Sequence, residues 1–520
     1  MNRNELAIKG STIGIASQIV NLIAKFVVRT FAIRILGKEI LGLDSVLIDT
    51  ISMLSLAEMG ITSAMLYRLY SPIINKDEKR IDEWMATYRI IYYVIAGVVA
   101  ALGIIISFSL PLIIKDISVP WSTIYIAFYL QLFSSVSSYL LAYRRILLNA
   151  DQKKHLCLLV DLAATVVFSI GKIIVVVIFK SYELYLVMTI FQTVTANVVL
   201  HVYSNKSYPY VNRKTHAKKD DILLILKDTK EVLANKLASY LYSSTDNLII
   251  SVFLGTGVVG LLSNYKYISS ALRGMVNSAM TTIQPLIGNY LNSDTLKADS
   301  YKTLKRYTYV RYMIAGASTV PFISLAETFI LIWTGDSSYL MAPTITVFLA
   351  LDYYIGCVYG PLGEYILGMG LFSQGKYATF AGAFTNIVLS LVGARIWGCN
   401  GVLLATVISQ CVIWIGDTYI IMFHYYADQP EYKWNYIKTN LLYIGLMAVC
   451  VAASYASVLL LPVSNLWVKF ILGAIISEIV FWGIAILATV HSDEFIYAKG
   501  LTEKVVKRIK KGLTNMRRFI

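Results

Sequence analysis

The sequence predicts an all-α protein that crosses a membrane many times. Of its 520 residues, 57% are hydrophobic and only 15% are charged, whereas about a quarter of the residues of a soluble chain are charged. The apolar residues gather in segments that each approach the roughly 20 residues needed to span a bilayer. Lys and Arg concentrate in alternate polar segments between them. These observations predict a polytopic membrane protein with about fourteen transmembrane helices.

The expected spans follow one another with short connections. They cover residues 12–33, 43–66, 90–114, 121–142, 156–179, 184–203, 232–254, 258–287, 307–333, 343–367, 377–397, 402–423, 437–461 and 467–490. Because the count is even, both termini should lie on one side of the membrane.

The distribution of the 46 Lys and Arg residues supports both the count and the orientation. Most of them fall on the side that holds the N-terminus. The opposite side has only Arg34, Lys38, Lys115, Lys180, Arg395 and Lys469. By the positive-inside rule, the side with more bases is cytoplasmic. Topology therefore explains the net charge of +15 better than nucleic-acid binding does.

The longest polar interruption separates two halves of the chain. Residues 204–231 contain Pro209 and are rich in Lys and Asp. Within them, apolar residues from Ile222 to Leu226 recur at helical spacing, which predicts an amphipathic helix along the inner surface. We expect residues 1–203 to form the first half and 491–520 a basic cytoplasmic tail, which either binds anionic lipid headgroups or is simply solvated.

A short pattern recurs in the two halves. The sequence L-G-x-x-x-x-G-L-x-S occurs at Leu36–Ser45 and again at Leu254–Ser263, each time between two hydrophobic segments. This recurrence indicates a duplicated bundle, although a short Leu- and Gly-rich pattern can also recur by chance.

Four bases inside the expected spans are candidates for binding an anionic substrate. Lys25 and Arg29 are four residues apart, and Lys266 and Arg273 are seven apart, so each pair shares one helix face. A cation near the bilayer centre costs roughly 2.5 to 3.5 kcal/mol on insertion, so it usually faces a cavity or a partner. For three other bases, Lys172, Lys236 and Arg311, we favour snorkelling to a helix end or pairing with an acid.

Acidic residues also lie inside apolar segments. They either carry protons for ion coupling or neutralise the bases, and we favour pairing for most of them. The candidates are Glu58, Asp161, Asp246, Asp352 and Glu364. No catalytic, metal-binding or cofactor-binding motif emerges: the five Cys and five His residues are scattered, and the phosphate-binding G-x-x-x-x-G-K-[ST] motif is lacking. We expect no enzymatic activity.

Several short motifs resemble those of the Wzx-type oligosaccharide flippases. They are Gly37 with Gly42, Leu56-Ala57-Glu58-Met59-Gly60-Ile61, Thr245-Asp246-Asn247, Phe253-Leu254-Gly255 and Ser263-Asn264-Tyr265. The resemblance implies a fold of the superfamily that includes multidrug and toxic compound extruders and lipid II flippases. Two six-helix lobes, here residues 1–203 and 232–424, would surround a central cavity, and residues 425–490 would add two further helices.

The resemblance also implies a function. Such flippases move an oligosaccharide repeat unit linked to undecaprenyl diphosphate from the cytoplasmic to the outer leaflet of the plasma membrane. Lys25, Arg29, Lys266 and Arg273 stand on the helices that line the cavity in that family. The implied partners are the lipid-linked oligosaccharide, membrane lipids and a polysaccharide polymerase, with no cofactor and no nucleic acid.

Three alternatives remain. An ion-coupled multidrug antiporter of the same superfamily would prefer an acidic or apolar cavity, which the surplus of intramembrane bases disfavours. A membrane glycosyltransferase or polymerase would normally have a long outer loop with clustered acids, whereas every expected outer loop is short. A scaffold without transport would not need buried charge.

The charge distribution makes one directly testable prediction. A cysteine introduced at Lys214, in the expected cytoplasmic linker, should be inaccessible to a membrane-impermeant thiol reagent added outside intact cells, and should react after the membrane is permeabilised. Labelling of that cysteine in intact cells would overturn the orientation.

Overall fold

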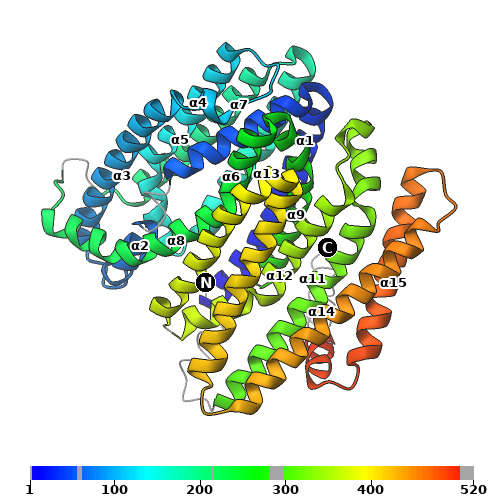
Figure 1. Cartoon of the computed structure of the whole chain (residues 1–520). Helices are drawn as coiled ribbons and strands as arrows, with labels where there is room; N and C mark the ends of the chain where they lie inside the picture. The colour runs from blue at the N-terminus through cyan, green and yellow to red at the C-terminus, as the bar shows by residue number, and fades with distance from the viewer. Residues whose placement is uncertain (1–2, 56–60, 212–214, 281–296, 370, 504–520) are drawn as a thin grey trace, which may run out of the picture. The chain divides into compact units, whose positions relative to one another are not determined.

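The computed structural model describes residues 3–55, 61–211, 215–280, 297–369 and 371–503, and its regular elements are all helices (Figure 1). The expected spans fall on helices throughout the described residues, which confirms the all-α polytopic fold. Nine of the described helices are long and apolar enough to cross a membrane. The chain divides into two compact units, residues 1–264 with 386–405, and residues 265–385 with 406–520.

The first unit contains the helices of the N-terminal half. They are α1 (Arg3–Leu54), α2 (Ile61–Ile74), α3 (Glu78–Ser107), α4 (Leu110–Ile113), α5 (Trp121–Ala150), α6 (Lys154–Phe179), α7 (Tyr182–Ser207) and α8 (Lys219–Leu254), with the start of α9 (Thr256–Met280) and the middle of α13 (Phe372–Tyr419). Within this unit α5 packs against α3 and α7, and α6 packs against α1 and α7.

The second unit contains the remaining helices. They are the rest of α9 and α13, with α11 (Lys297–Thr334), η2 (Ser337–Tyr339), α12 (Pro343–Gly368), η3 (Ile420–Tyr425), α14 (Pro430–Leu459) and α15 (Leu466–Thr489). Helix α11 packs against α12, α14 and α15. Many of the buried side chains at these contacts are tyrosines; for example, the rings of Tyr312 and Tyr443 stack with their centroids 4.4 Å apart.

Glycines with positive φ join consecutive spans without a loop. Element α1 contains the expected span 12–33 and the start of the span 43–66, and Gly37 between them has φ 82°. Element α13 contains the expected span 377–397 and most of the span 402–423, and Gly398 between them has φ 59°. Gly255, at the end of α8, has φ 93°. Only glycine adopts these angles without steric cost. Gly37 and Gly255 occupy the same position of the repeated motif, so both copies turn at their second residue.

The two copies of the motif also contact each other. A Cβ atom built on Gly42 would lie 2.1 Å from the carbonyl oxygen of Thr256, and one built on Gly260 would lie 1.8 Å from the carbonyl oxygen of Lys38. These distances are far below van der Waals contact, so neither position admits a side chain. Gly42 and Gly260 are equivalent in the two copies. Helices α1 and α9 therefore cross where the equivalent glycines of the two repeats meet. Small residues permit such a close approach between membrane helices.

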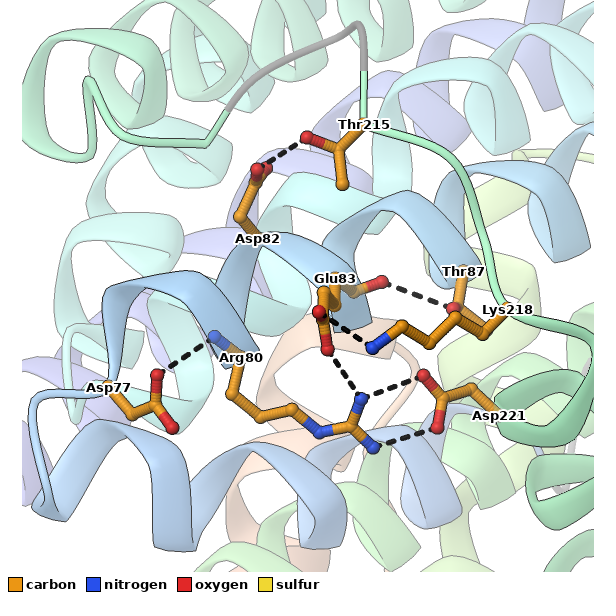
Figure 2. A network of polar contacts seen from close by, with 8 residues as sticks. All are labelled: Asp77, Arg80, Asp82, Glu83, Thr87, Thr215, Lys218 and Asp221. Carbon is orange, nitrogen blue, oxygen red and sulfur yellow. Dashed lines mark hydrogen bonds and ion pairs between the residues drawn. The ribbon is translucent and has the colours of Figure 1, made fainter.

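A network of charged side chains fastens the connection between α7 and α8 to α3 (Figure 2). The guanidinium of Arg80 donates two hydrogen bonds to the carboxylate of Asp221, at 2.7 and 2.8 Å, and one to Glu83. Lys218 donates to the other oxygen of Glu83 at 2.7 Å. Asp221 is 4% exposed. The bidentate geometry and the burial of Asp221 make this a stronger attachment than an ordinary surface ion pair.

The crossing of α1 and α9 predicts that a single methyl group is disruptive at Gly260. Gly260→Ala should lower the thermal stability of the detergent-solubilised protein, because backbone must move and overpacking costs roughly 1–3 kcal/mol. Gly257→Ala on the same helix is the matched control, since a Cβ there meets nothing within 4 Å. Equal melting temperatures for the two variants would contradict the crossing.

The network in Figure 2 predicts a response to acid. Hydrogen bonds from Lys218 and Arg80 lower the pKa of Glu83 below its ordinary value of 4.5. The stabilisation is therefore complete above pH 4.5 and is lost as the pH falls through the lowered pKa. Hydrogen exchange of residues 215–222, corrected for intrinsic rates, should increase across that range.

The variant Glu83→Gln should show the increased exchange already at pH 7 and lose the acid response. Glu78→Gln is the control, because Glu78 is exposed and lies in the first turn of the same helix. An unchanged acid response in Glu83→Gln would show that Glu83 does not hold the connection.

Candidate functional site

Arg29 lies on α1 and contacts the segment of α9 that crosses it. Its Nη2 donates to Ser263 Oγ at 2.7 Å and to Asn264 Oδ1 at 2.9 Å. Ser263 and Asn264 in turn donate to the carbonyl oxygen of Gly260. The glycine crossing thus brings two neutral acceptors to the guanidinium and fixes their orientation. These hydrogen bonds fix the position of the guanidinium.

Lys25 lies one turn before Arg29 and is exposed. Both side chains project from the same face of α1, as their spacing predicts. Asp44, later in the same element, is close enough for its charge to interact with those of Arg29 and Lys172. The first unit therefore contains the pair of bases predicted from the sequence together with one carboxylate that the sequence analysis had not singled out.

Arg273, in the second unit, forms an ion pair with a carboxylate that the sequence also indicated. Its Nη2 lies 2.7 Å from Asp352 Oδ2 on α12 and 3.2 Å from the Asp352 carbonyl oxygen. Gly356 leaves room for the guanidinium, since a Cβ there would lie 2.4 Å from Arg273 Nη1. Arg273, a candidate substrate-binding base, and Asp352, a candidate ion-coupling acid, thus form an ion pair with each other. Lys266 is half-buried on the same helix.

Two of the other acids form structural ion pairs. Glu364 accepts hydrogen bonds from Arg311 and from the hydroxyl of Tyr307, and Arg311 is only 3% exposed. Asp161 accepts two hydrogen bonds from Arg145, at 2.7 and 2.9 Å. Each base meets a carboxylate from a neighbouring helix, which is how charge is usually accommodated inside a membrane protein.

The remaining predicted residues are distributed as follows. Asp246 on α8 is 3% exposed. Glu58 and the side chain of Lys236 lie outside the described residues, as does most of the basic tail. Lys172 is 9% exposed, and its Nζ donates to Gln192 Oε1 at 2.8 Å; among the described residues it forms no direct ion pair. Among the described residues, no group of three His, Cys, Asp or Glu side chains is arranged to hold a metal ion.

Sequence reasoning missed Asp44, Gln131 and Gln192. Asp44 is the second residue of the expected span 43–66 and was not among the acidic candidates. Gln131 and Gln192 stand within two other spans, where an uncharged amide attracts less notice than a charge. The available signal was the cost of an amide in hydrocarbon, which requires a hydrogen-bonding partner for each such side chain.

A family model described as "Polysaccharide biosynthesis protein" matches residues 7–291, more than half of the chain. The chain belongs to the polysaccharide biosynthesis protein family. The match covers α1 from residue 7 onward, together with both copies of the repeated motif. It confirms the family that the short motifs indicated. A search of curated proteins gave no match.

Solved structures share the fold. The lipid II flippase MurJ in an inward closed conformation matches with a TM-score of 0.69 at 14% identity, over 92% of this chain and 98% of that one. An inward-facing multidrug resistance MATE transporter of the MOP superfamily matches with a TM-score of 0.57 at 14% identity, over 79% and 97%. A eukaryotic MATE transporter matches with a TM-score of 0.55 at 16% identity, over 80% and 95%. The family member therefore has the fold expected from its sequence.

Proposed function

We propose that this protein moves an oligosaccharide linked to undecaprenyl diphosphate from the cytoplasmic to the outer leaflet of the plasma membrane, with both termini in the cytoplasm. The observation that carries the proposal is Arg29. Its guanidinium lies in a membrane-spanning helix and donates hydrogen bonds to Ser263 and Asn264, which fix its position. A cation within a membrane span is costly, so such residues are rare and commonly mark a substrate or ion pathway.

The chemistry of the substrate explains why the cation is needed. A diphosphate with a polar glycan cannot cross about 30 Å of hydrocarbon unaided. A guanidinium can replace part of the hydration of the diphosphate through parallel hydrogen bonds. Lys25, on the same face, adds a second positive charge, and Lys266 and Arg273 are the corresponding candidates in the second unit. The polyprenyl chain would remain in lipid while the headgroup is transferred.

The family and the fold agree with this proposal. The family description names polysaccharide biosynthesis, and one structurally similar protein is named a lipid II flippase. Alternating access of two units is the transport mechanism we infer. A polysaccharide polymerase acting on the outer leaflet is the expected partner.

The charge of Arg29 should be required for transport. Arg29→Ala should lower surface polysaccharide by about tenfold or more, because a charge-assisted hydrogen bond contributes roughly 1.5–3 kcal/mol. Arg29→Gln keeps a donor for Ser263 and Asn264 but removes the charge, and should be equally defective. Arg29→Lys should retain part of the activity, since it keeps the charge without the planar fork.

Arg395→Ala is the control, because Arg395 stacks over the ring of Phe253 and belongs to an expected outer helix end. It should support normal export. All variants are compared at equal amounts of membrane-inserted protein. Normal surface polysaccharide in Arg29→Gln would contradict the proposal, and drug resistance lost instead of polysaccharide would favour the multidrug antiporter.

A further inference from the structure

The first unit contains a cavity that the transport proposal above does not use. Its volume is about 370 Å³, near the lower end of the roughly 300–1,000 Å³ usual for ligand pockets. Residues of α1, α5, α6 and α7 line it, and most of them are polar, including Asp44, Gln131, Ser138, Lys172 and Thr189. Such a concentration of hydrogen-bonding groups within membrane helices is unfavourable unless it meets water or a polar ligand.

The wall of the cavity has hydrogen-bonding capacity that the described residues do not use. Gln131 Nε2 donates to Asp44 Oδ1 at 2.9 Å and to the hydroxyl of Tyr182 at 3.1 Å. Tyr182 also donates to Asp44 Oδ1. The orientation of the amide is therefore set by the carboxylate, which must accept. As a result Gln131 Oε1 is buried and accepts no hydrogen bond from any described residue.

A donor and several acceptors face the same space. Lys172 is 9% exposed and carries three N–H bonds, one of which is directed to Gln192. The hydroxyls of Ser138, Thr189 and Thr193 donate to carbonyl oxygens of their own helices. Their lone pairs remain able to accept. The cavity therefore offers both donors and acceptors.

This mixture selects the class of ligand. An inorganic cation would require acceptors alone, and the ammonium of Lys172 would repel it. A phosphate or another anion would require donors alone, and the carboxylate of Asp44 would oppose it. A sugar ring satisfies both sets, because each of its hydroxyls can donate and accept. The ring of Tyr185, whose centroid lies 5.4 Å from Lys172 Nζ, adds a flat apolar surface to the wall.

We propose that this cavity is a recognition site for a sugar ring of the transported oligosaccharide. The proposal rests on the proposed function, since it assigns the sugar to the first unit while Arg29 binds the diphosphate. The acceptor Asp44, which Gln131 orients, and the donor Lys172 define which hydroxyl positions fit. A sugar without the matching hydroxyls would leave buried polar groups unpaired and would be rejected.

Binding of two lipids distinguishes the sugar site from the diphosphate site. The full-length protein in nanodiscs is titrated with the lipid-linked repeat unit extracted from cells that lack this protein, and separately with undecaprenyl diphosphate. The unsubstituted protein should bind the lipid-linked repeat unit more tightly than it binds undecaprenyl diphosphate. Gln131→Leu and Ser138→Ala should weaken its binding, Gln131→Leu by about tenfold, and leave undecaprenyl diphosphate unaffected.

The matched control is Ser137→Ala. Ser137 precedes Ser138 on α5 and donates to a backbone carbonyl in the same way, but it does not line the cavity. It should bind both lipids normally. Melting temperatures in nanodiscs identify any variant that has lost its fold, and Ser138→Ala keeps the test valid should Gln131→Leu be unstable.

The outcomes separate the two proposals. Arg29→Ala should weaken the binding of both lipids. If the unsubstituted protein binds neither lipid, or if the Arg29→Ala variant binds both normally, the proposed function is overturned and the sugar site with it. If Arg29→Ala behaves as expected but Gln131→Leu and Ser138→Ala bind the lipid-linked repeat unit normally, or weaken both lipids equally, the sugar site alone is overturned.

Discussion

The contact between Gly42 and Gly260 is the constraint on which the rest of the first unit depends. Because neither residue has a side chain, α1 and α9 approach until backbone meets backbone. That approach carries Ser263 and Asn264 to the guanidinium of Arg29. A wider separation would leave Arg29 without these acceptors. The packing of two glycines thus determines the position of the charge that we propose to bind substrate.

The charges inside the helices fall into two groups. Arg145, Arg273 and Arg311 each form an ion pair with a carboxylate on another helix. Arg29 and Lys172 donate hydrogen bonds to uncharged side chains, Ser263 and Asn264 for Arg29 and Gln192 for Lys172. The ion pairs of the first group join neighbouring helices. From the second group, we propose that Arg29 binds the diphosphate and that Lys172 contributes to the sugar site.

The sequence was sufficient for the fold class, the spans and the family, because hydrophobic length and the placement of bases follow directly from the bilayer. The repeated motif also indicated equivalent turns, and Gly37 and Gly255 both have positive φ. The pairing of Arg273 with Asp352 could not be predicted, since it depends on which helices become neighbours. Asp44 and Gln131 were missed for the same reason: only packing of α1 against α5 makes them one site.

The composition of the first unit has a consequence for the order in which the protein can mature. Residues 386–405 belong to this unit although more than a hundred residues separate them from the rest of it. Asn386 contacts Thr245, and Arg395 stacks over Phe253. During synthesis the bundle of N-terminal helices therefore remains incomplete in the membrane until α13 has emerged from the ribosome. A nascent chain that stops before residue 386 would expose an unfinished surface to membrane quality control.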